Sequence, residues 1–404
     1  MEFAFKFIVR LFITMIISLV ITPVVKFIAL RIGAVDQPGE RRINEKAMPT
    51  AGGLAIFLSF SFAILWELND MIPINFAWRI LLGALIVIIV GLIDDIHELS
   101  PLQKISGLLI AALEIYFIAG IRISTISIPY IGTIDLGLFG MPMTILWILA
   151  ITNAVNLIDG LDGLASGVSI ISLITLGIIS YFFLPDTAVF ISMTIFTLVA
   201  AIVGFFPYNF YPATIFLGDT GALFLGFMIS VLSLQGLKNA TFITVITPML
   251  ILGVPITDTV YAMIRRKFNK QKISSADKMH LHHRLLSLGF THRGAVLTIY
   301  ALAMVFSFIA LLMNYASNTA IILLIISTAF GIELFIELIG LVGENRQPLM
   351  CALKFLGNRR FRQEVLTKRT GDSLETTEEP IKEPTESKKP QRTSRRKRRA
   401  RHKK

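Results

Sequence analysis

Residues 77–95 read AWRILLGALIVIIVGLIDD, a nearly unbroken run of apolar side chains that ends in two aspartates. A helix needs about 20 mostly apolar residues to cross a lipid bilayer. The stretch 77–93 therefore predicts a membrane span, and Asp94 and Asp95 are expected at the boundary between membrane and water. Because the chain repeats this alternation of apolar spans and polar connections, the same reasoning decides its fold class.

The chain as a whole has the composition of a membrane protein. It has 404 residues, of which 54% are hydrophobic, and globular domains rarely reach such a share. We expect an all-α polytopic membrane protein with about eleven transmembrane helices, each near the length that a bilayer requires. No removable signal peptide is expected, because the first span begins at the initiator and lacks a small-residue cleavage site. The predicted spans are 4–30, 51–68, 77–93, 105–120, 140–157, 161–183, 187–206, 219–236, 241–264, 294–314 and 317–341.

Lysine and arginine are concentrated in every second connection between the predicted spans. The other connections hold little positive charge beyond Arg122 and Lys238. Since an excess of positive charge marks cytoplasmic loops, we expect the N-terminus outside and the C-terminus in the cytoplasm. Lys6 and Arg10 weakly oppose this orientation. The expected cytoplasmic stretches are 31–50, 94–104, 153–160, 207–218, 265–293 and everything after 341.

Two segments outside the spans have their own character. Residues 122–137, RISTISIPYIGTIDLG, alternate β-branched and polar side chains, which predicts a short β-hairpin at the outer surface. We expect residues 344–404 to form a separate, largely disordered basic tail, because they cannot bury enough apolar area to fold alone. Residues 1–343 are then the transmembrane domain. Cys351 is the only cysteine, which excludes intramolecular disulfides and cysteine-based zinc clusters.

The basic tail predicts a membrane partner. Positive charge near an anionic membrane surface is attracted to its lipids by about 1 kcal/mol per charge. Polybasic runs also attract nucleic acid, but no nucleic acid is expected as a partner of a tail attached to a membrane domain.

Five polar segments hold nearly all of the chemically useful residues, and all five fall on the expected cytoplasmic side. This distribution predicts an enzyme that acts on a charged substrate at one membrane surface. A transporter of anions is the rival class, but its ionisable residues should lie near the bilayer midplane. A membrane anchor without chemistry is the third class. The segments are Glu40–Gly53, Asp94–Lys104, Asn153–Gly163, Asn209–Gly221 and Arg265–Arg293.

Carboxylates dominate three of these segments. Asp94 and Asp95 are candidates for a general base or for holding a divalent cation, although an isolated pair can also simply end a helix. In NAVNLIDGLDG, polar residues recur every third position, so neighbours share one helix face. A phosphate with Mg²⁺ or a nucleotide base would satisfy them, whereas a polar seam between spans is the alternative. The residues of this face are Asn153, Asn156, Asp159 and Asp162.

Asp219 lies in a GDTG turn that opens a predicted span. Mg²⁺ prefers one or two carboxylates together with phosphate oxygens and water, so Asp219 is a candidate ligand for a cation that bridges a diphosphate. Aspartate is also a common residue at the N-cap of a helix. Both interpretations of Asp219 stay open at this point.

The fourth segment carries the cluster HLHHR, residues 280–284. Zinc is a poor match, because the chain has no HExxH pattern and no cysteine nearby. Cationic and hydrogen-bonding side chains suit a diphosphate better, and arginine can make two parallel hydrogen bonds to it. A purely structural loop is the alternative. The residues concerned are His280, His282, His283 and Arg284.

The remaining polar residues give weaker signals. Lys46 precedes a Pro-Thr-Ala-Gly-Gly turn, whose glycines let the backbone approach a ligand. Asp258 lies near the cytoplasmic end of its predicted span and is expected to support the structure or the site. Glu333 and Glu337 share one face of the last span and are expected to pack within the bundle or at the lipid edge.

The five segments, in this order, resemble the polyprenyl-phosphate N-acetylhexosamine-1-phosphate transferase superfamily over about residues 1–341. The HLHHR form and the count of eleven spans are similar to its GlcNAc-1-phosphate branch. The muramoyl-pentapeptide branch typically carries three consecutive histidines and more often ten spans. Asn44 departs from the pattern, because many relatives carry histidine there.

The resemblance implies a reaction, a cofactor and a location. UDP-GlcNAc would give its GlcNAc-1-phosphate to undecaprenyl phosphate, forming a lipid-linked diphosphate sugar and UMP with Mg²⁺, or with Mn²⁺ in its place. This is the first membrane step of teichoic acid or O-antigen type polysaccharide synthesis at the plasma membrane of a bacterium. Phospho-N-acetylmuramoyl-pentapeptide transferase is the alternative activity. The oligomeric state is left open, with a homodimer as the alternative to a monomer.

The resemblance also assigns roles to individual residues. Asp94 and Asp95 match the catalytic aspartate pair, Asp219 matches the metal-binding aspartate, and Asp159 matches a further active-site aspartate near the metal. The remaining matches are substrate-binding groups, which line the nucleotide pocket or lie near the phosphates. They are Lys46, Asp162, Asn209 and Phe216 for the nucleotide, and Lys104, His280, His282, His283 and Arg284 for the phosphates.

Overall fold

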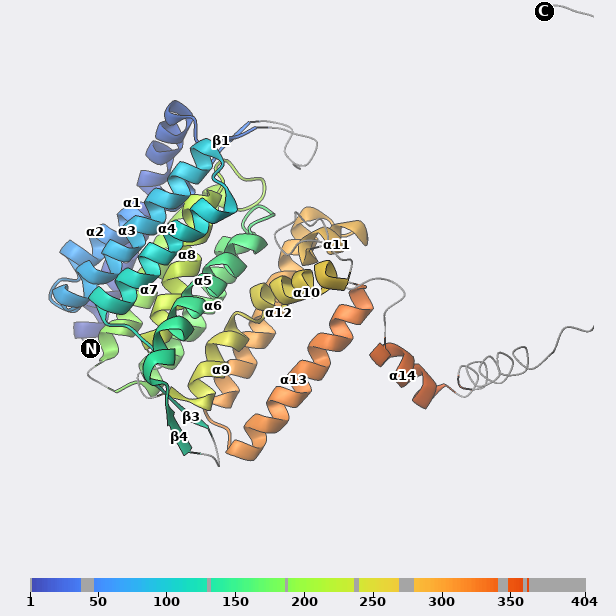
Figure 1. Cartoon of the computed structure of the whole chain (residues 1–404). Helices are drawn as coiled ribbons and strands as arrows, with labels where there is room; N and C mark the ends of the chain where they lie inside the picture. Colours follow the sequence, from blue (N-terminus) through green and yellow to red (C-terminus); the bar gives the residue numbers. More distant parts are fainter. Residues whose placement is uncertain are drawn as a thin grey trace, which may run out of the picture. The chain divides into compact units, whose positions relative to one another are not determined.

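The structure, a computed structural model, is mainly helical (Figure 1). It describes residues 2–37, 47–128, 132–185, 188–235, 240–268, 280–340, 348–358 and 362. The chain divides into two units, residues 1–347 and 348–404. In the second unit the structure describes one helix, α14 (Pro348–Gly357).

The first unit is a bundle of helices. Two of them are extended by short π-helical turns, η1 (Ala63–Glu67) after α2 and η2 (Ile115–Ala119) after α4. The helices are α1 (Glu2–Ile32), α2 (Gly52–Phe62), α3 (Ile74–His97), α4 (Pro101–Glu114), α5 (Gly140–Ile158), α6 (Leu164–Phe183), α7 (Val189–Asn209), α8 (Gly218–Gln235), α9 (Phe242–Ile251), α10 (Gly253–Phe268), α11 (Leu281–Ser287), α12 (His292–Met313) and α13 (Asn318–Ile339).

The expected class of an all-α multi-pass membrane protein is confirmed, but the count of eleven long spans is not. Among the described residues, nine helices are long and apolar enough to cross a membrane. The predicted span 51–68 is the shorter apolar helix Gly52–Glu67. The predicted span 241–264 is two helices, because the chain breaks between α9 and α10. Glycine and proline at the start of α10 explain this break, since proline cannot donate a helical hydrogen bond.

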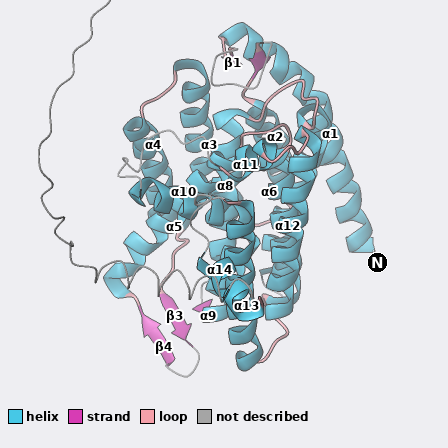
Figure 2. Cartoon of the chain, turned by 90° about the vertical axis from the view of Figure 1, so that its right-hand side faces the viewer, coloured by secondary structure: helices cyan, strands magenta, loops and turns pink. Residues whose placement is uncertain are grey.

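Two small sheets lie at opposite ends of the bundle (Figure 2). At one end β1 (Val35–Asp36) pairs antiparallel with β2 (Met48–Pro49). At the other end β3 (Thr125–Ile128) pairs antiparallel with β4 (Gly132–Asp135), and β5 (Ala240–Thr241) joins β3 in parallel. The turn between β3 and β4 lies outside the described residues, and its expected place at the outer surface stays a prediction.

Helix α8 is the centre of the bundle, and every residue from Thr220 to Gln235 is buried. Glycines bring two neighbours against its first turn. A Cβ atom on Gly53 would lie 2.1 Å from Cα of Gly221, and one on Gly91 would lie 2.5 Å from Cα of Thr220. Membrane helices associate through such close packing, because lipid tails are as apolar as leucine. The start of α8 is thereby fixed against α2 and α3.

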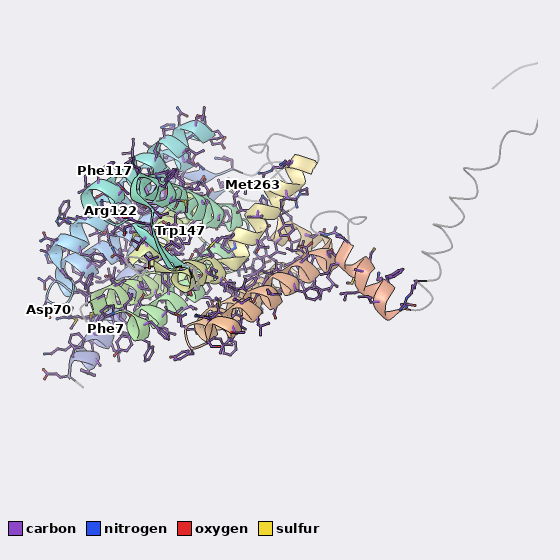
Figure 3. All side chains as sticks on the ribbon, turned by 60° about the horizontal axis from the view of Figure 1, so that its bottom comes forward. Phe7, Asp70, Phe117, Arg122, Trp147 and Met263 are labelled. Atoms are coloured by element: carbon purple, nitrogen blue, oxygen red, sulfur yellow. The ribbon has the colours of Figure 1, made fainter. Side chains whose placement is uncertain are left out.

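The end of the bundle away from β1 is held by ionic contacts between α1 and the connection before α3. Arg10 donates two hydrogen bonds to Asp70, at 2.5 and 3.0 Å, and Thr14 Oγ1 donates to Glu67 at 3.1 Å. Figure 3 labels Phe7 and Asp70 on this side. The Arg10 guanidinium lowers the pKa of Asp70 below its ordinary value. Because Asp70 is exposed, we assign this pair little stability.

The packing of α8 leads to a stability prediction. Gly53→Ala should lower the unfolding temperature in detergent, since overpacking costs about 1–3 kcal/mol. Gly331→Ala is the matched control, because a Cβ atom there meets nothing within 4 Å and alanine favours a helix by about 1 kcal/mol. Thermal unfolding followed by circular dichroism compares the two. Equal unfolding temperatures would contradict the close α2–α8 contact.

Candidate active site

A cavity of about 390 Å³ lies at the end of the bundle where α8 begins. Its walls come from the ends of α3, α5 and α7, from the starts of α8 and α12, and from α11. Its volume falls within the range of about 300–1,000 Å³ that is usual for small-molecule pockets. Residues predicted from separate segments therefore meet here. They are Asp95, Asn156, Asp159, Asp162, Asn209, Phe216, Asp219, His282 and His283.

The carboxylate of Asp95 binds the first turn of α8. Asp95 Oδ1 accepts a hydrogen bond from the Asp219 amide at 2.9 Å. Asp95 Oδ2 accepts from the amide and the hydroxyl of Thr220, at 3.1 and 2.5 Å. The first amides of a helix lack partners within the helix, and a negative charge there is favourable. The cap of α8 is thus supplied by α3, which leaves the Asp219 side chain for other partners.

The turn before α8 is bonded to the glycine segment before α2. The Gly52 and Gly53 amides donate to the carbonyls of Phe216 and Leu217, at 3.0 and 3.1 Å, and the Phe216 amide donates to the Pro49 carbonyl at 2.9 Å. These bonds hold Phe216 in the cavity wall. The sequence predicted that these glycines let the backbone approach a ligand. In the structure, they let it approach the backbone of residues 216 and 217.

Lys104 joins two of the predicted aspartates. Its Nζ forms an ion pair with Asp94 and lies 3.2 Å from Asp219 Oδ1. Asn156 donates a hydrogen bond to the same oxygen of Asp219. Asp94 is buried and also accepts from the Leu99 amide at 2.7 Å. The adjacent aspartates therefore differ in position: Asp95 lines the cavity, whereas Asp94 holds Lys104 beside it.

Asp159 is the cavity carboxylate with the fewest contacts. Among the residues that the structure describes, none donates a hydrogen bond to its side chain. Burial, and then the negative charges of Asp219, Asp95 and Asp162, raises the pKa of Asp159 well above its ordinary value. Asp162, by contrast, accepts from the Ala213 amide at 2.9 Å. The cavity therefore concentrates negative charge around Asp159.

The histidine segment is anchored by Asp258 of α10. Asp258 Oδ2 lies 2.9 Å from His280 Nδ1, and Oδ1 accepts from the Leu281 amide at 2.8 Å. The His282 ring packs on Gly160. A Cβ atom added to Gly160 would lie 2.3 Å from His282 Nε2. Burial, followed by neighbouring His283, lowers the pKa of His282 to about 3. At neutral pH His282 therefore offers the cavity a hydrogen bond and not a positive charge.

Several predicted residues do not line the cavity. Asn153 donates to the Leu149 carbonyl of its own helix at 2.7 Å. Arg284 Nε donates to the Ile339 carbonyl at 2.7 Å, which ties α11 to the end of α13. His280 is buried behind the wall, and Lys104 and Asp94 lie beside it as described. Lys46 falls outside the described residues.

Three polar side chains that line the cavity were not predicted as site residues from the sequence. Asp36 lies in β1 and precedes the first predicted segment. Thr50 follows β2, and its buried hydroxyl has no hydrogen-bond partner among the described residues. His292 Nε2 accepts from the Asp162 amide at 3.1 Å, and its ring stacks on Tyr211 with centroids 4.5 Å apart. The Pro-Thr-Ala-Gly-Gly turn was the signal for Thr50, and His292 lies within the predicted segment Arg265–Arg293, whereas Asp36 lies in none of the five segments.

The side chains of the cavity can hold a hard cation such as Mg²⁺ only if a bound ligand supplies further oxygen atoms. In the described part of the chain, no three histidine, cysteine or acidic side chains stand close enough to hold a metal ion by themselves. Mg²⁺ is usually held by one or two carboxylates together with phosphate oxygens and water. Asp159 and Asp219, which face the same cavity, fit this smaller requirement.

Known proteins resemble the chain over most of its length. Residues 77–237 match glycosyl transferase family 4. A probable undecaprenyl-phosphate N-acetylglucosaminyl 1-phosphate transferase of Bacillus subtilis (strain 168) is 40% identical over 357 residues, which cover 88% of this chain and 98% of that protein. A decaprenyl-phosphate N-acetylglucosaminephosphotransferase of Mycolicibacterium smegmatis is 33% identical, over 70% of this chain and 76% of that protein.

A third relative comes from Salmonella typhi. This undecaprenyl-phosphate alpha-N-acetylglucosaminyl 1-phosphate transferase is 30% identical over 298 residues, which cover 72% of this chain and 79% of that protein. With a similarity that spans nearly all of the Bacillus protein, the chain belongs to glycosyl transferase family 4, among the polyprenyl-phosphate N-acetylhexosamine-1-phosphate transferases.

Proposed function

We propose that this protein transfers GlcNAc-1-phosphate from UDP-GlcNAc to undecaprenyl phosphate, giving undecaprenyl-diphospho-GlcNAc and UMP. One observation carries the proposal: five aspartates from four chain segments line a single cavity at the end of a membrane bundle. The names of the relatives support the same reaction. A lipid acceptor explains the location, because its chain can stay in the bilayer while its phosphate reaches the cavity.

The reaction requires mainly positioning and charge neutralisation. An oxygen of the acceptor phosphate attacks the phosphorus that carries GlcNAc, and the bond from this phosphorus to the bridging oxygen breaks. UMP leaves with the electron pair of that bond. The second ionisation of a phosphate monoester lies near pH 6, so the acceptor needs only modest help to lose its proton.

Asp95 is the member of the aspartate pair that we assign to this proton. It lines the cavity, whereas Asp94 does not. A carboxylate offers about four acceptor sites, and the three donors from α8 leave room for one more. Asp94 is then a positioning residue that holds Lys104. The Lys104 ammonium, 3.2 Å from Asp219, supplies positive charge at the edge of the cavity.

We assign a divalent cation, Mg²⁺ or Mn²⁺ in its place, to Asp219 and Asp159. Such a cation, when bound, neutralises the diphosphate and orients it for displacement. The crowded negative charge around Asp159 supports this assignment. His282 and His283, which line the same cavity, would donate hydrogen bonds to phosphate oxygens.

The nucleotide would occupy the part of the cavity near α7. Phe216 supplies an apolar surface there, and Asp162 and Asn209 lie beside it. Asn209 is buried, accepts from Ser166 Oγ at 2.7 Å and donates to the Ile215 carbonyl at 3.2 Å. Its main effect is thus to shape the loop that carries Phe216. We further place the cavity on the cytoplasmic side of a bacterial plasma membrane, with the N-terminus outside.

The direct test uses purified protein, undecaprenyl phosphate and Mg²⁺ with either UDP-GlcNAc or UDP-MurNAc-pentapeptide. Mass spectrometry of the lipid fraction identifies the product. We expect undecaprenyl-diphospho-GlcNAc from the first donor and no product from the second. A product only from UDP-MurNAc-pentapeptide would show that this compound, and not UDP-GlcNAc, is the donor. No product from either donor would reject the proposed function.

Asp219→Asn should lower kcat by more than about 100-fold, because a neutral amide is a poorer ligand for a hard cation and stabilises less charge. The concentration of Mg²⁺ that gives half-maximal rate should rise as well. Asp70→Asn is the control, since Asp70 lies at the other end of the bundle. Normal turnover by Asp219→Asn at ordinary Mg²⁺ would remove Asp219 from the metal site.

A further prediction separates direct transfer from a covalent sugar-phosphate intermediate on an aspartate. Direct transfer requires both substrates to be bound together. Labelled UMP should therefore not exchange into UDP-GlcNAc while prenyl phosphate is absent, and exchange should begin when it is added. Exchange in a rigorously lipid-free preparation, or an adduct on Asp159 found by mass spectrometry, would refute the direct route.

A further inference from the structure

The first residue of α12 brings a histidine side chain into the wall of the polar cavity. His292 lines this cavity together with Asp162, and its Nε2 accepts a hydrogen bond from the Asp162 amide at 3.1 Å. The proposed transfer of GlcNAc-1-phosphate assigns no role to His292. A side chain that lines the cavity and stands next to a proposed nucleotide-binding residue is a candidate for a contact with the same ligand.

The orientation of the His292 ring is fixed by contacts on the protein side. Besides the hydrogen bond from Asp162, the ring stacks on Tyr211, with centroids 4.5 Å apart and planes at 28°. Arg293 holds Tyr211 in turn: its guanidinium carbon lies 5.4 Å from the Tyr211 ring centroid, and its Nη2 donates to the Tyr211 carbonyl at 3.3 Å. A side chain held in this way loses little further freedom when it binds a ligand.

The hydrogen bond from Asp162 also determines which nitrogen of His292 carries the proton. A backbone amide can only donate, so Nε2 is the acceptor, and the proton of the neutral imidazole is on Nδ1. Among the residues that the structure describes, none forms a hydrogen bond with Nδ1. His292 therefore has one N–H donor left for a ligand.

Asp162 supplies a hydrogen-bond acceptor next to this donor. Its Oδ2 accepts from the Ala213 amide at 2.9 Å, and in the described part of the chain no group donates to Oδ1. Because the Asp162 amide is bonded to His292, the two residues are neighbours in the cavity wall. A carboxylate beside a neutral N–H suits a ligand that presents a donor and an acceptor side by side. It suits a phosphate poorly, because like charges repel.

The uracil ring presents such an edge, since its N3–H donor is next to the O4 acceptor. The acetamide group of GlcNAc has the same two kinds of atom, but its amide bond is trans and directs them to opposite sides. Cytosine carries an acceptor at N3 and an amino donor at N4. It would therefore set donor against donor and acceptor against acceptor at this pair of residues.

We propose that His292 is a nucleotide-binding residue that selects uracil: its Nδ1–H donates to O4 of the base, while Asp162 Oδ1 accepts from N3–H. Tyr211 and Arg293 are positioning residues that hold the imidazole. Phe216 lies in the same loop as Tyr211, residues 210–217, and offers an apolar surface in the same cavity. This inference rests on the proposed function, because it requires a uridine nucleotide in the cavity.

Binding of UMP and CMP measures this selectivity without turnover. Full-length protein in detergent with Mg²⁺ is titrated with each nucleotide by isothermal titration calorimetry. We expect the wild type to bind UMP at least tenfold more tightly than CMP. His292→Ala should reduce this ratio by about fivefold or more, because UMP loses a hydrogen bond and CMP no longer meets an opposing donor.

Two conservative variants separate a contact with the base from support of the protein. The side-chain nitrogen of asparagine can occupy the position of Nδ1, whereas the side-chain oxygen of glutamine can reach the position of Nε2. His292→Asn should therefore keep most of the preference for UMP, and His292→Gln should lose it. The reverse order would show that His292 only supports the turn at Asp162, and would reject the contact with the base.

Thr291 provides the matched control. Its hydroxyl accepts from the Gly294 amide at 3.1 Å and so caps α12 beside His292, but Thr291 does not line the cavity. Thr291→Ala should lower the unfolding temperature, because it removes a helix cap, and should leave the ratio of UMP to CMP affinity unchanged. An equal fall of this ratio in Thr291→Ala would attribute the effect of His292→Ala to the stability of α12 and reject the proposal.

The other outcomes also overturn the assignment. Equal weakening of UMP and CMP in His292→Ala would move the contact to the ribose or the phosphate. Unchanged binding of both, with a higher KM for UDP-GlcNAc, would move it to the sugar. Equal binding of UMP and CMP by the wild type would reject selection of uracil. If the wild type binds neither nucleotide, the proposed function fails as well, whereas an unchanged preference for UMP in His292→Ala rejects this inference alone.

Discussion

The hydrogen bonds from the first turn of α8 to the Asp95 carboxylate are the contact on which the rest of the site depends. They join the end of α3 to the start of the central helix. Glycines at the contacts with α2 and α3 allow the backbones to come close enough for this contact to form. Because the start of α8 is held there, the Asp219 side chain contacts Asn156 and Lys104. Without these hydrogen bonds, the polar ends of the separate spans would not be held next to one another.

The site also has an electrostatic constraint. Five carboxylates line one cavity, and within the described residues Lys104 pairs with one of them, Asp219, and with Asp94 beside it. Burial, and then the like charges of neighbouring aspartates, disfavours the charged form of Asp159 and raises its pKa. A ligand that brings positive charge would favour that charged form. This arrangement of charges is the basis of the proposed cation site at Asp159 and Asp219.

The sequence predicted the membrane class and the convergence of the polar segments, because both depend on local composition and on the alternating direction of spans. It could not predict which partner each side chain takes. Asp95 finds its partners at residues 219 and 220, and Arg284 finds its partner at Ile339. Glu114, buried inside a span against Gly83, was also missed. Such contacts are set by packing between distant segments, which periodicity does not encode.

The break between α9 and α10 has a consequence for the reach of the chain. A straight continuation of α9 would carry the 16 residues of α10 about 24 Å further along the same axis, at about 1.5 Å per residue. Instead, α10 runs obliquely to α9 (Figure 1). The residues of α10 thereby run sideways from α9, and Asp258 anchors the histidine segment beside the end of α5 and the start of α8. A break between two membrane helices can thus place an anchoring residue such as Asp258 away from the axis of the first helix.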